Sequence, residues 1–273
     1  MRFIFYLIVF LFGLAVGSFL NCVIYRLEKK ESFLKGRSFC PHCKHILNWQ
    51  DLIPLFSFLF LKGKCRYCQK RISLQYPLVE LATAFLFVLT FWILDFEIGL
   101  TFGFWILIIC FLIIIFVYDL KHYIIPNKVI YPAIIVVLLY RLFEILNFGH
   151  WDFFGIWDLG FGILKPIANP ILSAVVASGF FLSIVLISRG KWMGLGDVKL
   201  AFFIGLFLGF PNVLVALFLS FLIGAIIGLG LISVGEKTLR SEVPFGPFLV
   251  IGTFIAMFLG DNLINWYLNL FKI

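Results

Sequence analysis

Charged side chains are scarce in this 273-residue chain: Asp, Glu, Lys and Arg make up only 13% of it, whereas hydrophobic residues make up 63%. Soluble globular chains are about a quarter charged and about half apolar. The shortage of charge therefore excludes an ordinary soluble domain. Repeated apolar runs of about 20 residues are typical of transmembrane helices. Because lipid cannot hydrogen-bond to the edges of an open sheet, such runs predict helices rather than strands.

Acidic residues are few as well, 14 against 22 Lys and Arg, which leaves a net charge of +8. Residues 26–71 hold eleven of the basic residues and three acids, so this one stretch accounts for the whole excess. A basic loop next to a membrane span is typical of the cytoplasmic side. We therefore expect no nucleic acid as a partner. The loop's expected partner is anionic membrane lipid.

Neither a signal cleavage site nor an internal repeat is evident. The first apolar run, residues 3–24, is long for a signal peptide core, and we expect it to remain as a membrane helix. The apolar runs and the Lys and Arg bias predict eight spans with both termini outside. The predicted spans are approximately residues 3–25, 77–94, 100–118, 128–146, 170–187, 198–210, 213–234 and 243–268.

The predicted fold is thus an all-α polytopic membrane protein with a small cytoplasmic loop domain. We expect three parts: a first transmembrane helix (1–25), the basic loop domain (26–76) and a transmembrane domain (77–273). Residues 147–169 are expected to form an outside loop with an interfacial aromatic piece, and residues 236–242 a second small cytoplasmic loop.

The basic loop contains two Cys-x-x-Cys pairs separated by 21 residues, Cys40 and Cys43 and then Cys65 and Cys68. Two such pairs at this spacing are typical of a closed tetrahedral zinc site, which would be structural. A disulfide framework is the alternative, but a reducing cytoplasmic location disfavours it. We expect the neighbouring His42 and His45 to be solvated. The apolar stretch at 52–60 is too short to span, and we expect it either to pack in the zinc lobe or to lie at the membrane interface.

Two aspartates occupy the cytoplasmic ends of predicted spans. Asp119 follows the third apolar run, and Asp197 begins the sixth within Gly194-Leu195-Gly196-Asp197. Acids at membrane depth are costly and frequently functional. Glu80 and His122 also lie near span ends, but position alone favours a solvated helix-start carboxylate and a solvated histidine.

Two neighbouring carboxyl groups do not both ionise cheaply, so they share a proton. The ionised member then serves as general base on a water, and the protonated member polarises a carbonyl. Asp119 and Asp197 therefore predict an aspartic protease that needs no cofactor for hydrolysis, provided that the fold brings them together. Two unrelated interfacial acids are the alternative.

The chain resembles the type IV prepilin peptidases, a GxGD aspartic protease family that is bifunctional as leader peptidase and N-methyltransferase. The resemblance covers nearly the whole chain. It rests on Gly17-Ser18-Phe19-Leu20-Asn21 with Arg26, the two Cys-x-x-Cys pairs, Tyr76-Pro77-Leu78-Val79-Glu80-Leu81, Asp119 with Ile125-Pro126-Asn127, the segment 193–200, and Pro244-Phe245-Gly246-Pro247-Phe248-Leu249.

The resemblance implies that Asp119 and Asp197 cut the short basic leader from prepilins or pseudopilins at the cytoplasmic face of the bacterial inner membrane. It also implies methylation of the new amino terminus from S-adenosylmethionine. The sequence has no glycine-rich strand-to-helix loop of the Rossmann type, so we assign no residues to that methyl donor.

Three alternatives have a basis in the residues. Another GxGD intramembrane protease, of the presenilin kind, would fit Tyr118-Asp119 but not the cysteine-bearing loop. A proton-coupled transporter would use the two aspartates as a relay, although no repeated halves are apparent. A metal-containing assembly factor without catalysis is the third.

Overall fold

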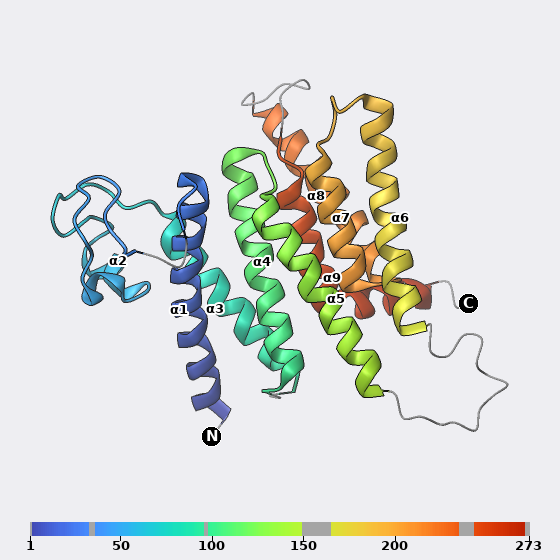
Figure 1. The fold of residues 1–273 in the computed structure, drawn as a ribbon, viewed down its shortest axis with the longest axis horizontal. Helices are drawn as coiled ribbons and strands as arrows, with labels where there is room; N and C mark the ends of the chain where they lie inside the picture. The colour runs from blue at the N-terminus through green and yellow to red at the C-terminus, as the bar shows by residue number, and fades with distance from the viewer. Residues whose placement is uncertain (1, 33–35, 96–97, 149–164, 235–242, 271–273) are drawn as a thin grey trace. The chain divides into compact units, whose positions relative to one another are not determined.

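The computed structural model is all-helical in the part of the chain that it describes, residues 2–32, 36–95, 98–148, 165–234 and 243–270. This confirms the predicted fold class. Figure 1 shows the long helices and the loop that follows the first of them. The predicted outside loop at 147–169 and the second cytoplasmic loop at 236–242 lie largely or wholly outside the described residues.

The long helices match the predicted spans one for one. They are α1 (Arg2–Lys29), α3 (Gln75–Ile93), α4 (Leu100–His122), α5 (Asn127–Phe148), α6 (Lys165–Ser188), α7 (Leu195–Leu208), α8 (Asn212–Ser233) and α9 (Gly246–Leu270). Six of them, all except α5 and α7, are long and apolar enough to cross a membrane. The 14 residues of α7 rise about 21 Å, less than the roughly 30 Å of a hydrocarbon core, so this predicted span is shorter than a full crossing.

The chain divides into two compact units, residues 1–114 and 115–273, and α4 runs through the boundary. In the first unit α1 packs along α3. Gly13 and Gly17 face α3 so closely that a Cβ at Gly13 would lie 2.5 Å from the Cα of Ala84, and one at Gly17 would lie 2.7 Å from the Cα of Glu80. Small residues four apart allow this close approach of helices where no hydrophobic effect drives association.

In the second unit α6 packs against α7, and α8 packs against α9. An aromatic cluster joins three of these helices: Phe181 of α6 stacks on Phe221 of α8 at 5.9 Å, and Phe245, just before α9, lies 5.0 Å from Phe221. Aromatic pairs of this kind add to the packing beyond the area that they bury.

The carboxyl end of the short helix α7 has polar partners from neighbouring helices. The Arg141 guanidinium donates to the carbonyl of Phe207 at 2.7 Å and pairs with Glu144, three residues further along α5, at 2.8 Å. The side chain of Asn169 accepts from the Phe210 N–H and donates to its carbonyl. These bonds satisfy carbonyl groups that a helix end would otherwise leave unpaired.

We predict that Gly17→Ala destabilises the protein by about 1–3 kcal/mol, because the nearest atom to the added methyl group is the Cα of Glu80, which cannot move aside as a side chain could. The measurement is thermal unfolding in detergent. Gly179→Ala is the matched control, since nothing lies within 4 Å of a Cβ at that helical glycine. Equal melting temperatures for the two variants would contradict the close packing of α1 on α3.

Candidate active site and metal centre

The two Cys-x-x-Cys segments fold into the same backbone turn. In the first turn, the Cys40 N–H donates to the His45 carbonyl and the Lys44 N–H donates to the Cys40 carbonyl, both at 2.9 Å. The second turn, beginning at Cys65, repeats both bonds at 2.9 and 3.0 Å. Lys44 and Gln69, each four residues after the first cysteine of its turn, share a positive φ of 60° and 57°. An isolated antiparallel bridge flanks each turn. Such matched turns present two thiols each to one point.

The four thiols converge. All four Sγ atoms lie within 4.8 Å of one another, and those of Cys40 and Cys68 are 3.9 Å apart. Zn–S bonds of about 2.3 Å in a tetrahedron would place sulfur atoms roughly 3.8 Å apart, so the cluster fits a metal ion of that kind. None of the four is in a disulfide. Burial acts to raise the pKa of the Cys40 thiol, but backbone N–H groups of Cys43 and His42 lower it to about 7.

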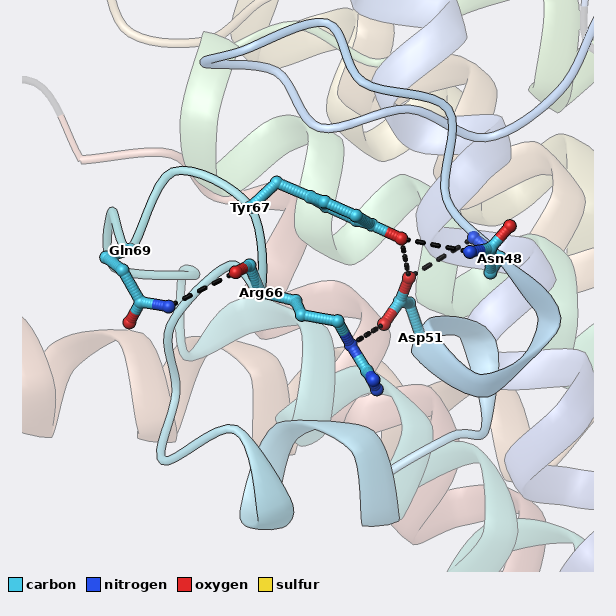
Figure 2. Close-up of polar contacts among 5 residues, drawn as sticks. All are labelled: Asn48, Asp51, Arg66, Tyr67 and Gln69. Atoms are coloured by element: carbon cyan, nitrogen blue, oxygen red, sulfur yellow. Dashed lines mark hydrogen bonds and ion pairs between the residues drawn. The ribbon is translucent and has the colours of Figure 1, made fainter.

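The histidines beside the cysteines are not part of this cluster, as expected, and both are exposed. His45 lies instead against the Tyr67 ring, with ring centroids 3.6 Å apart and the planes tilted by 35°. Figure 2 shows the polar network on the other edge of that ring: the Asp51 carboxylate accepts from the Tyr67 hydroxyl at 3.1 Å and from Arg66 Nε at 2.8 Å. The same carboxylate accepts from the Asn48 N–H. This network ties the segment between the two turns to the second turn.

The second unit contains a cavity of about 940 Å³ lined by both predicted aspartates. Asp119 lies in the last turn of α4, and its side chain is buried with only 4% of the residue exposed. Asp197 lies in the first turn of α7. The two carboxyl groups are close enough to interact electrostatically. The fold therefore brings together two acids that are 78 positions apart in the chain.

Two helix amino termini point at these carboxyl groups. The Gly246 N–H, at the start of α9, donates to the Asp119 carboxylate. A Cβ at position 246 would collide with that same carboxylate, so any other residue there would displace the Asp119 side chain. The Asp197 carboxylate lies close to the backbone N–H of Gly194, the residue just before α7. Helix amino termini stabilise negative charge, so the cavity suits chemistry that develops an anion.

Lys199, two residues further along α7, also lines the cavity. Its ammonium group donates to Asn127 Oδ1 at 2.9 Å and lies 5.2 Å from the centre of the Tyr131 ring. Both partners belong to α5. The bond and the cation–π contact thus hold the start of α7, and with it Asp197, against the start of α5.

Two residues that were expected to be solvated, Glu80 and His122, are both at least partly buried. Glu80 was expected to be solvated, and this is wrong: it is only 6% exposed, and its Oε2 accepts from the Leu55 N–H at 2.7 Å. His122 lies 4.5 Å from the Tyr118 ring and does not line the cavity. The sequence predicted no contact between Gly246 and Asp119, although Gly246 belongs to one of the motifs named above. The glycine between two prolines at the start of an apolar run was the signal available for it.

Two family models match the chain. Residues 11–94 match the bacterial peptidase A24 N-terminal domain, and residues 106–229 match the type IV leader peptidase family. The first match includes the four-cysteine cluster, and the second includes both Asp119 and Asp197. No solved structure matches the chain.

Curated relatives match it over nearly its full length. A protein of Legionella pneumophila is 34% identical over 97% of this chain and 94% of its own length. One of Bacillus subtilis is 34% identical over 96% of this chain and 98% of its own, and one of Aeromonas hydrophila is 32% identical over 98% and 95%. Each is named a prepilin leader peptidase/N-methyltransferase.

We predict that Cys43→Ser lowers the metal content of the purified protein from about one ion per chain towards zero, because a closed site needs all four thiolates. The measurement is elemental analysis of the protein purified without added metal. Cys110→Ser is the control, since Cys110 is a half-buried residue of α4 outside the cluster. Equal metal content in the two variants would show that the cysteine cluster is not the metal site.

Proposed function

Because the chain belongs to the type IV leader peptidase family, we propose that it is a membrane aspartic endopeptidase that removes the short basic leader of prepilins or pseudopilins and methylates the new amino terminus. The observation that supports the peptidase most directly is the shared cavity of Asp119 and Asp197. The names of the relatives support the methyltransferase. They also favour the prepilin branch over a presenilin-like protease or a transporter.

In the proposed mechanism the two carboxyl groups hold one proton between them. The ionised group takes a proton from a water molecule, which attacks the scissile carbonyl carbon, while the protonated group donates a hydrogen bond to the carbonyl oxygen. The resulting tetrahedral intermediate collapses when a carboxyl group of the pair donates its proton to the amide nitrogen, which leaves as an amine. The Gly246 N–H holds Asp119 in place during these transfers, and the Lys199 bond to Asn127 holds the start of α7.

The proposed metal is zinc, held by Cys40, Cys43, Cys65 and Cys68 in a structural role. Four thiolates fill a tetrahedral shell and leave no position open for water, so the ion would stabilise the loop and take no part in hydrolysis. S-adenosylmethionine is the proposed methyl donor. The described residues include no strand that leads into a glycine-rich turn and helix, so no Rossmann-type site for it is assigned.

The proposed location is the bacterial inner membrane, with the cavity facing the cytoplasm. The support is the clustering of Lys and Arg in residues 26–71 and around the cavity, where Lys191 and Lys199 both lie. The proposed partners are the prepilin substrates and membrane lipid, with no nucleic acid.

We predict that Asp119→Asn and Asp197→Asn each lower cleavage of a prepilin-like peptide by about 10³-fold or more, because removing one of two acids that act together abolishes the function of both. The measurement is mass spectrometry of the products in detergent with S-adenosylmethionine present. A product heavier by one methyl group would support the second activity. Asp261→Asn is the matched control, because Asp261 bonds Asn212 outside the cavity and an amide keeps that acceptor. Normal cleavage by either of the first two variants would make that aspartate structural.

A second prediction concerns the backbone support of Asp119. Gly246→Ala should lower cleavage by at least about 10²-fold, because the methyl group displaces the carboxylate and misplacement of a reacting group is costly. The control is Gly228→Ala in α8, where a Cβ meets nothing within 4 Å. Both variants should unfold at the same temperature as the unaltered chain to within a few degrees. Full activity of Gly246→Ala would contradict the geometry described for α9.

A further inference from the structure

The segment between the two cysteine turns exposes large apolar side chains although it is not part of a membrane span. It contains the short helices η1 (Trp49–Leu52) and α2 (Phe56–Phe60). Trp49 is 74% exposed, Leu59 61% and Phe60 83%, and Leu52, Ile53 and Phe56 are exposed as well. Soluble surfaces rarely gather so many apolar groups, and where they do, the patch marks an interaction site.

The exposure is one-sided within α2. The Phe58 ring turns inward and lies against Gly63, where a Cβ would come within 3.1 Å of its Cζ. Phe56, Leu59 and Phe60 occupy positions i, i+3 and i+4 and point away from the loop. This division between an inward face and an outward apolar face is typical of a short interfacial helix, which packs one face on its own domain and the other against an apolar medium.

The middle of the segment is hydrogen-bonded to the membrane span α3. The Leu55 N–H donates to Oε2 of Glu80 at 2.7 Å, and Leu55 has a φ of 63°, a conformation that persists only where neighbours hold it. Glu80 is five residues into α3, about 7.5 Å along that helix from its start at Gln75. The segment is thus held near the level at which α3 enters the membrane. In the view of Figure 1 the loop with α2 lies beside the carboxyl-terminal half of α1 and not beyond its end.

A second fastening holds the same loop to α1. The buried guanidinium of Arg26 donates to the carbonyls of Ser32 and Gly36 at 3.2 and 2.8 Å. The Tyr25 ring meets the Phe39 ring edge-on at 5.9 Å. The loop is therefore anchored at its start on α1 and at its middle on α3, so the exposed apolar residues cannot move far from the membrane surface.

The charged residues around the segment indicate what its exposed apolar side chains contact. From Cys40 to Arg71 there are six basic residues and one acid, and that acid, Asp51, is already paired with Arg66. Lys62 and Lys64, directly after α2, are exposed. A positive rim beside aromatic and aliphatic groups complements an anionic lipid surface. The same rim repels a basic peptide such as the leader of the proposed substrate.

We propose that residues 49–60 are an interfacial anchor that inserts into the anionic lipid of the bilayer surface and fixes the height of the cysteine-bearing loop above the membrane. The inference rests on the proposed membrane location and not on the peptidase chemistry. Trp49, Leu59 and Phe60 are the residues that enter the acyl-chain region, and Lys62 and Lys64 contact the headgroup phosphates.

The test uses the full chain in nanodiscs of phosphatidylcholine and phosphatidylglycerol, with a fraction of the lipid carrying a diazirine near the top of one acyl chain. After irradiation, mass spectrometry locates the lipid adducts. We expect several-fold more adducts on residues 49–60 than on the second cysteine turn, residues 65–70. The outward residues of α1, such as Phe3 and Leu7, are the internal control for a bilayer around the protein. Adducts on α1 without adducts on 49–60 would overturn the proposal.

The charge is tested with the double variant Lys62→Gln and Lys64→Gln. It should lose adducts on 49–60 several-fold in discs with phosphatidylglycerol and little in discs of phosphatidylcholine alone, with its metal content unchanged. An equal loss in both discs would show that the lysines support the fold of the loop and not a lipid contact.

The competing occupant is the apolar helix of a substrate. Adding an excess of a prepilin-like peptide to the unaltered protein should leave the adducts on 49–60 unchanged. Loss of those adducts, with α1 still labelled, would assign the surface to the substrate and overturn the lipid anchor. Failure of the proposed peptidase activity would leave this labelling pattern as it is, so the two conclusions are tested separately.

Discussion

A bilayer offers no hydrogen-bond partners to a polypeptide backbone, and this constraint governs the whole structure. Inside each long helix the backbone satisfies itself, but each helix end leaves N–H or carbonyl groups unpaired. Those groups must find partners, and the chain supplies them with charged and amide side chains: Arg141 and Asn169 at the carboxyl end of α7, and two aspartates at the amino ends of α7 and α9. In a membrane protein with so little charge, the polar residues therefore collect where helices stop.

The candidate active site follows from that rule. Asp197 is a favourable residue for the first turn of a helix on dipole grounds alone, and Asp119 accepts the leading N–H of α9. Each acid thus has a structural partner of its own, and the site arises because the two helix starts and the end of α4 meet at one cavity. The glycine at 246 lets the backbone of α9 approach the carboxylate, which a side chain at that position would displace. In the proposed mechanism, the fixed backbone dipoles beside the two acids need no reorganisation when charge develops.

The cysteine-bearing loop is too small to be stabilised by a hydrophobic core of its own. It relies on the two matched turns that gather the thiols, on the Asp51 network and on its attachments to α1 and α3. Its apolar side chains, which a soluble domain of greater size would bury, face outward instead. In the proposed lipid anchor, the bilayer surface next to the loop would remove the cost of that exposure.

The sequence by itself determined the helical class, the approximate spans, the four cysteines and the two aspartates, because each depends on local information: hydrophobic runs set by bilayer thickness, and ligand spacing set by a tight turn. The Arg141–Glu144 pair was predictable for the same reason, since three residues separate neighbours on one helix face. What depended on distant segments was decided only by the tertiary structure. Glu80 has the position of a solvated helix-start acid, and only packing of the loop on α3 reveals it as a buried acceptor. The meeting of Asp119 with Asp197, and the glycine that permits it, likewise depends on helices far apart in the chain, whose contacts no local pattern records.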